Sequence, residues 1–86
     1  MSEGQKTRTT VDIYGQHYVI IGTEDSSHVK LIASMVDEKM REISSKNPSL
    51  NTSKLAVLTA VNAVNDYLKM KEQLERLEGE SKRVKD

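Results

Sequence analysis

Cysteine, tryptophan and phenylalanine are absent from this chain of 86 residues, and it has a single proline. Without cysteine it cannot form a disulfide, bind a metal through thiolates or supply a thiol nucleophile. Small domains bury a low fraction of their surface and usually need a further source of stability. We therefore expect association with other chains to supply it. The lack of cysteine also fits a reducing, cytoplasmic setting.

An excess of charge of one sign is also missing, because 13 basic and 13 acidic residues cancel. A general nucleic-acid binder or a protein of anionic membrane surfaces usually carries a basic excess. The chain has no apolar run of about 18 residues and no signal-peptide core at its polar start. We expect a soluble, cytoplasmic protein that neither inserts into membranes nor binds nucleic acid.

Motifs for catalysis and cofactor binding are lacking as well. The four dispersed glycines match no phosphate-binding loop, and no serine occupies a G-x-S-x-G turn. The two histidines, His17 and His28, have no obvious carboxylate partner and no ligand spacing. We expect no enzymatic activity, no catalytic residue, no cofactor and no metal.

The N-terminal part of the chain predicts a β-hairpin over residues 7–22, after a polar segment (1–6) that we expect to be disordered. Residues 7–14 and 17–22 are rich in β-formers, and Gly15-Gln16 between them fits a two-residue turn. Such a turn pairs Tyr14 with His17. Because an isolated hairpin is marginal in water, its apolar face should pack on helices. That face consists of Val11, Ile13, Tyr18 and Ile20.

A first helix is expected over about residues 27–45, where apolar residues recur every three or four positions. Asp37 and Arg41 form an i,i+4 pair on its polar side. Asn47-Pro48 ends it, since the residue before proline avoids the helical region. The apolar positions are Val29, Ile32, Ala33, Val36, Met40 and Ile43, widened by Leu31 and Met35.

A second helix should begin at residue 52, after the N-cap residue Asn51, and run to about residue 84. Between residues 55 and 68 it is apolar on nearly every side, and a helix of that kind must be covered all round. The chain is too short to do this, so a second copy should provide the cover. Further on, a three-four apolar spacing indicates a coiled-coil seam. The expected oligomer interface is Val57, Val61, Val64, Tyr67, Leu68, Met70, Leu74 and Leu77.

These elements predict an α+β fold. An N-terminal β-hairpin packs on a helix and is followed by a long C-terminal helix that forms an intersubunit coiled coil. We divide the chain into a head (7–66) and a coiled-coil tail (67–86) that frays at its end.

Three segments of the sequence together resemble the ZapA family, Z-ring-associated cell-division proteins of bacteria, in its Bacillus-like form. They are VDIYGQHYVI, ASMVDEKMREI and KLAVLTAVNAVNDYLKM, in that order. The resemblance implies a homodimer, and a homotetramer formed through antiparallel coils. It also implies binding to FtsZ, the tubulin-like division GTPase, with alignment and bundling of its protofilaments at the mid-cell division site, which supports Z-ring stability and septation.

The resemblance implies that charged head residues contact FtsZ. The hairpin turn carries the neutral Gln16, so we assign candidate contacts to Arg41, Lys46 and Lys54 instead. Two alternatives stay open: a coiled-coil adaptor for another partner, and a nucleic-acid-binding strand–helix–helix dimer. In the second alternative, Lys6, Arg8 and Thr10 would lie on a β-ribbon in a major groove.

Overall fold

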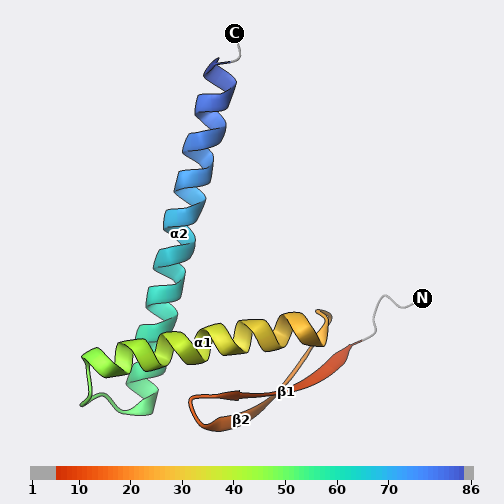
Figure 1. The fold of residues 1–86 in the computed structure, drawn as a ribbon, viewed down its shortest axis with the longest axis vertical. Helices are drawn as coiled ribbons and strands as arrows, with labels where there is room; N and C mark the ends of the chain where they lie inside the picture. The colour runs from red at the N-terminus through yellow and green to blue at the C-terminus, as the bar shows by residue number, and fades with distance from the viewer. Residues whose placement is uncertain (1–5, 85–86) are drawn as a thin grey trace.

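The computed structural model describes residues 6–84. Over this range an antiparallel hairpin of β1 (Thr7–Ile13) and β2 (Gln16–Gly22) is followed by α1 (Ser26–Lys46) and α2 (Thr52–Val84). Figure 1 shows α2 rising from the C-terminal half of α1, with the hairpin running beside the N-terminal half of α1. The predicted α+β class and element order are confirmed. The expected disorder at the start falls mainly on residues 1–5 and the expected fraying partly on residues 85–86, all outside the described residues.

The predicted hairpin turn is wrong by one residue. The two turn residues are Tyr14 and Gly15, with φ values of 51° and 80°, and Ile13 pairs with Gln16. A two-residue turn with both central residues at positive φ has the twist that the flanking strands require. The register consequently moves by two positions, so that Val11 faces Tyr18. A shift of two keeps every side chain on its predicted face.

Gly15→Ala is expected to destabilise the protein by about 1–2 kcal/mol, since L-residues pay roughly this in the left-handed region. A Cβ added at Gly15 would meet no neighbouring atom within 4 Å, so the cost comes from φ alone. Denaturant unfolding would measure it. Gly22→Ala is the matched control. A Cβ added at Gly22 also meets no neighbouring atom within 4 Å, and the φ of Gly22 lies outside the left-handed region. Equal losses for the two variants would contradict this account.

Both helices begin close to the predicted positions, and α1 also ends close to its predicted end, for local reasons. Asn51 caps α2, because its Oδ1 accepts the backbone N–H of Lys54 at 2.9 Å. Asp25 is the N-cap of α1, but it receives the N–H groups of His28 and Val29 on its backbone carbonyl and not on its side chain. The end of α1 at Lys46 agrees with the stop expected from Asn47-Pro48.

The buried apolar core is small and lies mainly along α1. Val11 of β1 packs with Val29 and Ala33 of α1, and Ile13 lies against this cluster. Met40 and Leu55 are the other buried apolar residues in the part of the chain that the structure describes. The prediction for the hairpin face is therefore wrong for its β2 half, where Tyr18 and Ile20 stay exposed. The reason is that α1 packs along β1 and leaves β2 beside it uncovered.

An ion pair fixes α2 to α1 where the two helices cross. Lys39 Nζ donates to Asp66 Oδ2 at 2.8 Å, and this hydrogen bond raises the pKa of Lys39 and lowers that of Asp66. On the same side of α2, Leu55 is buried, and so is Thr59, whose hydroxyl donates to the Leu55 carbonyl. One side of α2 therefore packs on α1, and the residues described on its other sides are exposed to solvent.

Candidate functional site: exposed apolar faces of the long helix

Apart from the side that meets α1, α2 displays two apolar strips to solvent. We call the first the seam; it comprises Ala56, Ala60, Ala63, Tyr67, Met70, Leu74 and Leu77, all exposed. We call the second the valine strip; it comprises Val57, Val61, Val64 and Leu68, also exposed. All eight residues predicted for an oligomer interface lie in these strips, with exposures between 47% and 67%.

The two strips are neighbours on the helix surface. The first four seam residues are each followed directly by a valine-strip residue, and successive residues of an α-helix are turned by about 100°. Seam and valine strip together therefore occupy a broad face of α2 that no part of residues 6–84 covers. Monomeric proteins rarely expose a continuous apolar surface of this extent, and such surfaces mark interaction sites.

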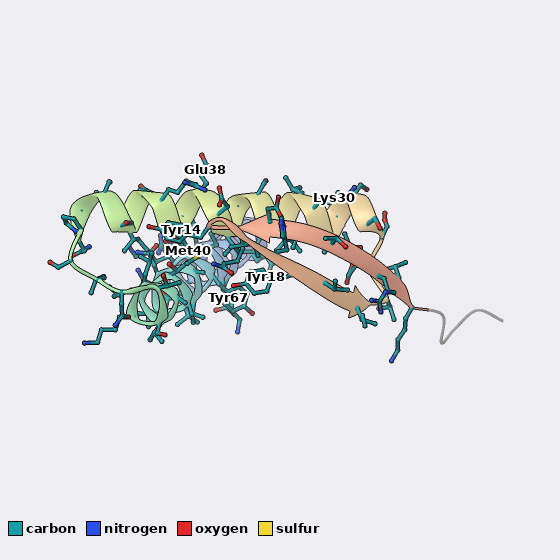
Figure 2. The ribbon with its side chains drawn as sticks, turned by 90° about the horizontal axis from the view of Figure 1, so that it is seen from below. Tyr14, Tyr18, Lys30, Glu38, Met40 and Tyr67 are labelled. Atoms are coloured by element: carbon teal, nitrogen blue, oxygen red, sulfur yellow. The ribbon has the colours of Figure 1, made fainter. Side chains whose placement is uncertain are left out.

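A groove lies beside the seam, where the hairpin, α1 and the start of α2 meet. We call it the hairpin groove; its volume is about 370 Å³, and its lining includes Tyr18, Ile20, Val36, Met40 and Ala56. Figure 2 shows Tyr18, Met40 and Tyr67 on the side of α1 that faces α2 and the hairpin, with Glu38 on the outer side. Every lining residue is uncharged, so the groove suits an aliphatic or aromatic occupant.

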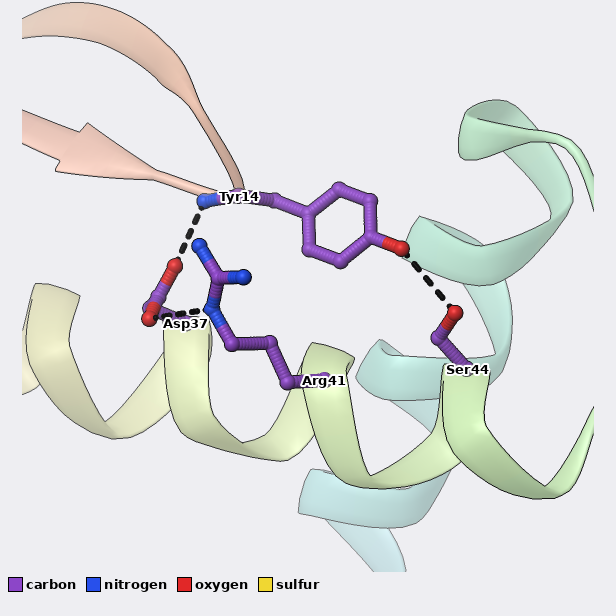
Figure 3. A network of polar contacts seen from close by, with 4 residues as sticks. All are labelled: Tyr14, Asp37, Arg41 and Ser44. Atoms are coloured by element: carbon purple, nitrogen blue, oxygen red, sulfur yellow. Dashed lines mark hydrogen bonds and ion pairs between the residues drawn. The ribbon is translucent and has the colours of Figure 1, made fainter. Parts of the chain in front are cut away.

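A polar network anchors the hairpin turn to α1 (Figure 3). Asp37 Oδ1 accepts the backbone N–H of Tyr14 at 2.7 Å, and its Oδ2 accepts Arg41 Nε at 3.0 Å. The Tyr14 hydroxyl donates to Ser44 Oγ at 2.9 Å. The Arg41 guanidinium lies 5.4 Å from the centre of the Tyr14 ring, within the range of a cation–π contact. These contacts hold Tyr14 in its left-handed conformation.

This network predicts a pH dependence. The hydrogen bonds from Arg41 and from the Tyr14 backbone hold the pKa of Asp37 below its ordinary value of 3.8. Because the pKa of Asp37 is lower in the folded state than in the unfolded state, the stabilisation by the ionised Asp37 carboxylate is complete above the unfolded-state pKa. It is lost as the pH falls through the folded-state pKa. We expect the unfolding temperature to drop below about pH 4, and Asp37→Asn to remove part of that drop.

Thermal unfolding followed by circular dichroism at several pH values would test this dependence. Asp66, whose pKa is lowered by Lys39, should account for a further part of the drop. Glu38→Gln is the matched control, because Glu38 is a carboxylate next to Asp37 on the outer side of α1. If Glu38→Gln flattens the profile as much as Asp37→Asn, the network does not explain the acid sensitivity.

The three candidate FtsZ contacts lie near the end of the head where α1 connects to α2. Lys46 is in the last turn of α1 and Lys54 in the first turn of α2, and both are exposed. Arg41 is also exposed, at 61%, but Asp37 and the Tyr14 ring hold its guanidinium in place. The pair of Arg41 with Asp37 was predicted from the sequence. The contacts of these two residues with Tyr14 were not predicted, because Tyr14 lies 23 positions from Asp37.

The two histidines form pairs that the sequence did not predict. His17 contacts Asp12, its direct cross-strand partner in the observed register, and His28 lies 3.8 Å from Glu24. Among the side chains that the structure describes, no group of three or more from His, Cys, Asp or Glu is placed to hold a metal ion. Over residues 6–84, neither helix combines the length and the apolar character needed to cross a bilayer.

These features define a small α+β protein whose candidate site is a pair of open apolar helix faces beside a charged head. Comparison with known proteins agrees: the family model "Cell division protein ZapA" matches residues 9–86. A cell division protein ZapA of Geobacillus sp. (strain WCH70) is 69% identical over 77 residues, covering 90% of this chain and 88% of the relative. The chain belongs to the ZapA family of cell division proteins.

Two further relatives support this assignment. The cell division protein ZapA of Bacillus subtilis (strain 168) is 58% identical over 82 residues, covering 95% of this chain and 96% of the relative. A solved structure, described as a ZapA mutant dimer from Geobacillus stearothermophilus, matches with a TM-score of 0.73 and 51% identity over 95% of both chains. The relatives from Geobacillus sp. and Bacillus subtilis are named for cell division and not for a catalysed reaction.

Proposed function

We propose that this protein is a homo-oligomeric scaffold, without enzymatic activity, that binds FtsZ and aligns and bundles its protofilaments at the mid-cell Z-ring. The observation that carries the proposal is the open apolar face of α2, formed by the seam and the valine strip. In a chain with so small a core, this apolar face stays exposed to solvent unless another copy covers it. The solved structure described as a ZapA mutant dimer from Geobacillus stearothermophilus supports this reading.

Self-association would proceed through the seam. Tyr67, Met70, Leu74 and Leu77 repeat at alternating spacings of three and four, which pairs two helices into an intersubunit coiled coil. Pairing of two such coils in antiparallel fashion would give a tetramer with heads at both ends. Gly79 weakens the distal helix by about 1 kcal/mol relative to alanine. We therefore expect a dimer that forms tetramers as its concentration rises.

Bundling would follow from valency. Heads at both ends of the assembly (residues 7–66 of each copy) can reach two filaments, and the tails (67–86) hold them together. Linked modules gain avidity without any new contact, since the second binding event is intramolecular. Weak binding by each head, repeated along a filament, is then enough to hold protofilaments side by side in the cytoplasm.

The basic residues at the α1–α2 end of the head are the proposed FtsZ contacts. Lys46 and Lys54 are exposed there, and Arg41 is held in a fixed orientation by Asp37. A guanidinium that is already oriented loses less rotamer entropy when it meets a carboxylate. The three residues would thus present a basic surface to an acidic partner.

Co-sedimentation of FtsZ polymers in the presence of GTP tests this function. The protein should increase pelleted FtsZ and bundle thickness. Leu74→Lys, which places a charge in the exposed seam far from the head, should abolish bundling and leave binding of single filaments intact. Charge reversal at an exposed polar position of the tail, Glu75→Lys, is the control and should bundle normally. Unchanged FtsZ sedimentation with the wild-type protein would refute the proposal.

A further inference from the structure

The guanidinium of Arg41 is held beside the hairpin turn, although its backbone belongs to α1. Its Nε donates to Asp37 Oδ2 at 3.0 Å, and its Cζ lies 5.4 Å from the centre of the Tyr14 ring. Figure 3 shows the guanidinium between Asp37 and this ring. The side chain is nevertheless largely exposed. The head thus presents a cation of fixed orientation next to a turn whose own residues are uncharged.

Most of the donors of this guanidinium are not used inside the chain. Arginine presents its N–H groups in a planar fork. Among the described residues, only Nε of Arg41 has a hydrogen-bond acceptor, and the two terminal nitrogens have none. The edge formed by the two terminal nitrogens matches the spacing of the two oxygens of a carboxylate, which it can bind through parallel hydrogen bonds. The open edge is therefore suited to a carboxylate.

Asp37 leaves room for a second anion. It occupies the Nε side of the guanidinium, and its other oxygen accepts the backbone N–H of Tyr14 at 2.7 Å. A carboxylate on the terminal edge would touch the guanidinium and would lie farther from Asp37. Because the Coulomb energy falls with distance, its attraction to Arg41 exceeds its repulsion by Asp37.

Tyr14 fixes the plane of the guanidinium. The backbone of Tyr14 is bound by Asp37, and its hydroxyl donates to Ser44 Oγ at 2.9 Å. The ring is therefore held on α1 at both ends, and it covers one face of the Arg41 guanidinium. An arginine held in this way has little rotamer freedom left to lose on binding, which favours affinity.

We infer that Arg41 is the receptor for a single carboxylate of the partner, bound through both terminal nitrogens, and that Asp37 and Tyr14 are its positioning residues. This receptor rests on the proposed function, since the carboxylate would belong to FtsZ, and it adds the chemistry by which the head recognises that partner. Lysine offers a point charge and no planar fork. Lys46 and Lys54 would then supply general attraction, whereas Arg41 would supply recognition.

Conservative replacement of Arg41 tests the receptor. The apparent affinity of the full-length protein for FtsZ polymers is measured by co-sedimentation at fixed ionic strength. Arg41→Lys keeps the charge and the pairing with Asp37, but it should weaken binding roughly tenfold or more, because it loses a charge-assisted hydrogen-bond pair. Arg8→Lys, the same exchange at an exposed position of β1, is the matched control and should bind like the wild type. Equal affinity of Arg41→Lys and the wild type would overturn the receptor.

Replacement of Tyr14 tests the positioning role. Tyr14→Asn removes the ring, while asparagine tolerates the left-handed conformation and keeps the backbone N–H that Asp37 binds. It should shift the NMR resonance of the Arg41 Nε–H group in the free protein and weaken FtsZ binding roughly two- to tenfold. Tyr14→Phe keeps the ring and should retain most of the affinity. A shifted resonance with unchanged affinity would show that Tyr14 does not position Arg41 for binding. If Tyr14→Asn does not fold, the comparison of Arg41→Lys with Arg8→Lys still decides.

The outcomes separate the receptor from the proposed function. If the wild-type protein does not bind FtsZ, the proposed function fails, and the partner assigned to Arg41 fails with it. If the wild type binds and Arg41→Lys binds equally well, only the receptor is wrong. Sedimentation velocity identifies the source of the carboxylate: Arg41→Lys should form oligomers of wild-type size. Smaller oligomers would assign the carboxylate to a second copy of this chain and overturn its assignment to FtsZ.

Discussion

Replacing Leu55 with alanine is expected to lower the free energy of unfolding by about 2–5 kcal/mol, the range for large-to-small changes at well-packed core sites. Leu55 is 1% exposed and is the only fully buried large side chain in the described part of the chain. It lies in the first turns of α2, where its N–H donates to the Asn51 carbonyl. A cavity here would loosen the contact of α2 with α1, and this core has few other residues to compensate.

Urea denaturation at several protein concentrations would measure the effect of Leu55→Ala. Val57→Ala is the matched control, since Val57 lies two positions away and is 65% exposed. Leu55→Ala should destabilise the protein at every concentration. Val57→Ala should act only through assembly, and its effect should therefore change with protein concentration. A smaller loss for Leu55→Ala than for Val57→Ala in the dilute protein would show that the core is not centred on Leu55.

The parts of the fold that depend on local chemistry could be predicted from the sequence. Asn51 caps α2 and Pro48 follows the end of α1 because capping and proline geometry act over a few residues. The apolar faces of α2 could also be predicted, because helical spacing alone assigns residues to faces. Apolar residues beyond those that one chain can cover indicate a partner without any knowledge of the tertiary structure.

The turn could not be predicted correctly because a distant contact decides it. A glycine-first turn at Gly15-Gln16 is the local preference. The observed turn places Tyr14 at positive φ, which is uncommon for a residue with a bulky side chain. Asp37 and Ser44, on a helix that follows later in the chain, bind the Tyr14 backbone and hydroxyl. The pairing of His17 with Asp12 was missed for the same reason, since it requires the shifted register.

The hairpin groove could not be predicted from the sequence either. Alternation along the strands assigns Tyr18 and Ile20 to the inner face, and that assignment is correct. Whether α1 covers both strands or only β1 depends on where the helix lies across a two-stranded sheet. Residue spacing carries no information about this position. The structure places α1 on β1, and an open apolar groove therefore remains where the sequence predicted core.

Val61→Glu is expected to convert the proposed oligomer into a monomer that keeps its helices. In a single copy Val61 is 60% exposed, so a glutamate at this position faces water and the chain's own core is untouched. In the proposed assembly the same carboxylate would be enclosed by the apolar surfaces of a second copy. An uncompensated buried charge costs roughly 3–5 kcal/mol, which weakens dimerisation by about a hundredfold or more.

Sedimentation velocity combined with circular dichroism separates the two parts of this expectation. Val61→Glu should sediment as a monomer at concentrations at which the wild-type protein is oligomeric, with little loss of helical signal. Asn65→Glu, an exposed change outside both apolar strips of the same helix, should sediment like the wild type. Oligomers of wild-type size for Val61→Glu would show that the valine strip lies outside the interface. Because the proposed bundling requires linked heads, the monomeric variant should also leave FtsZ filaments separate, which would tie the apolar face of α2 to the proposed function.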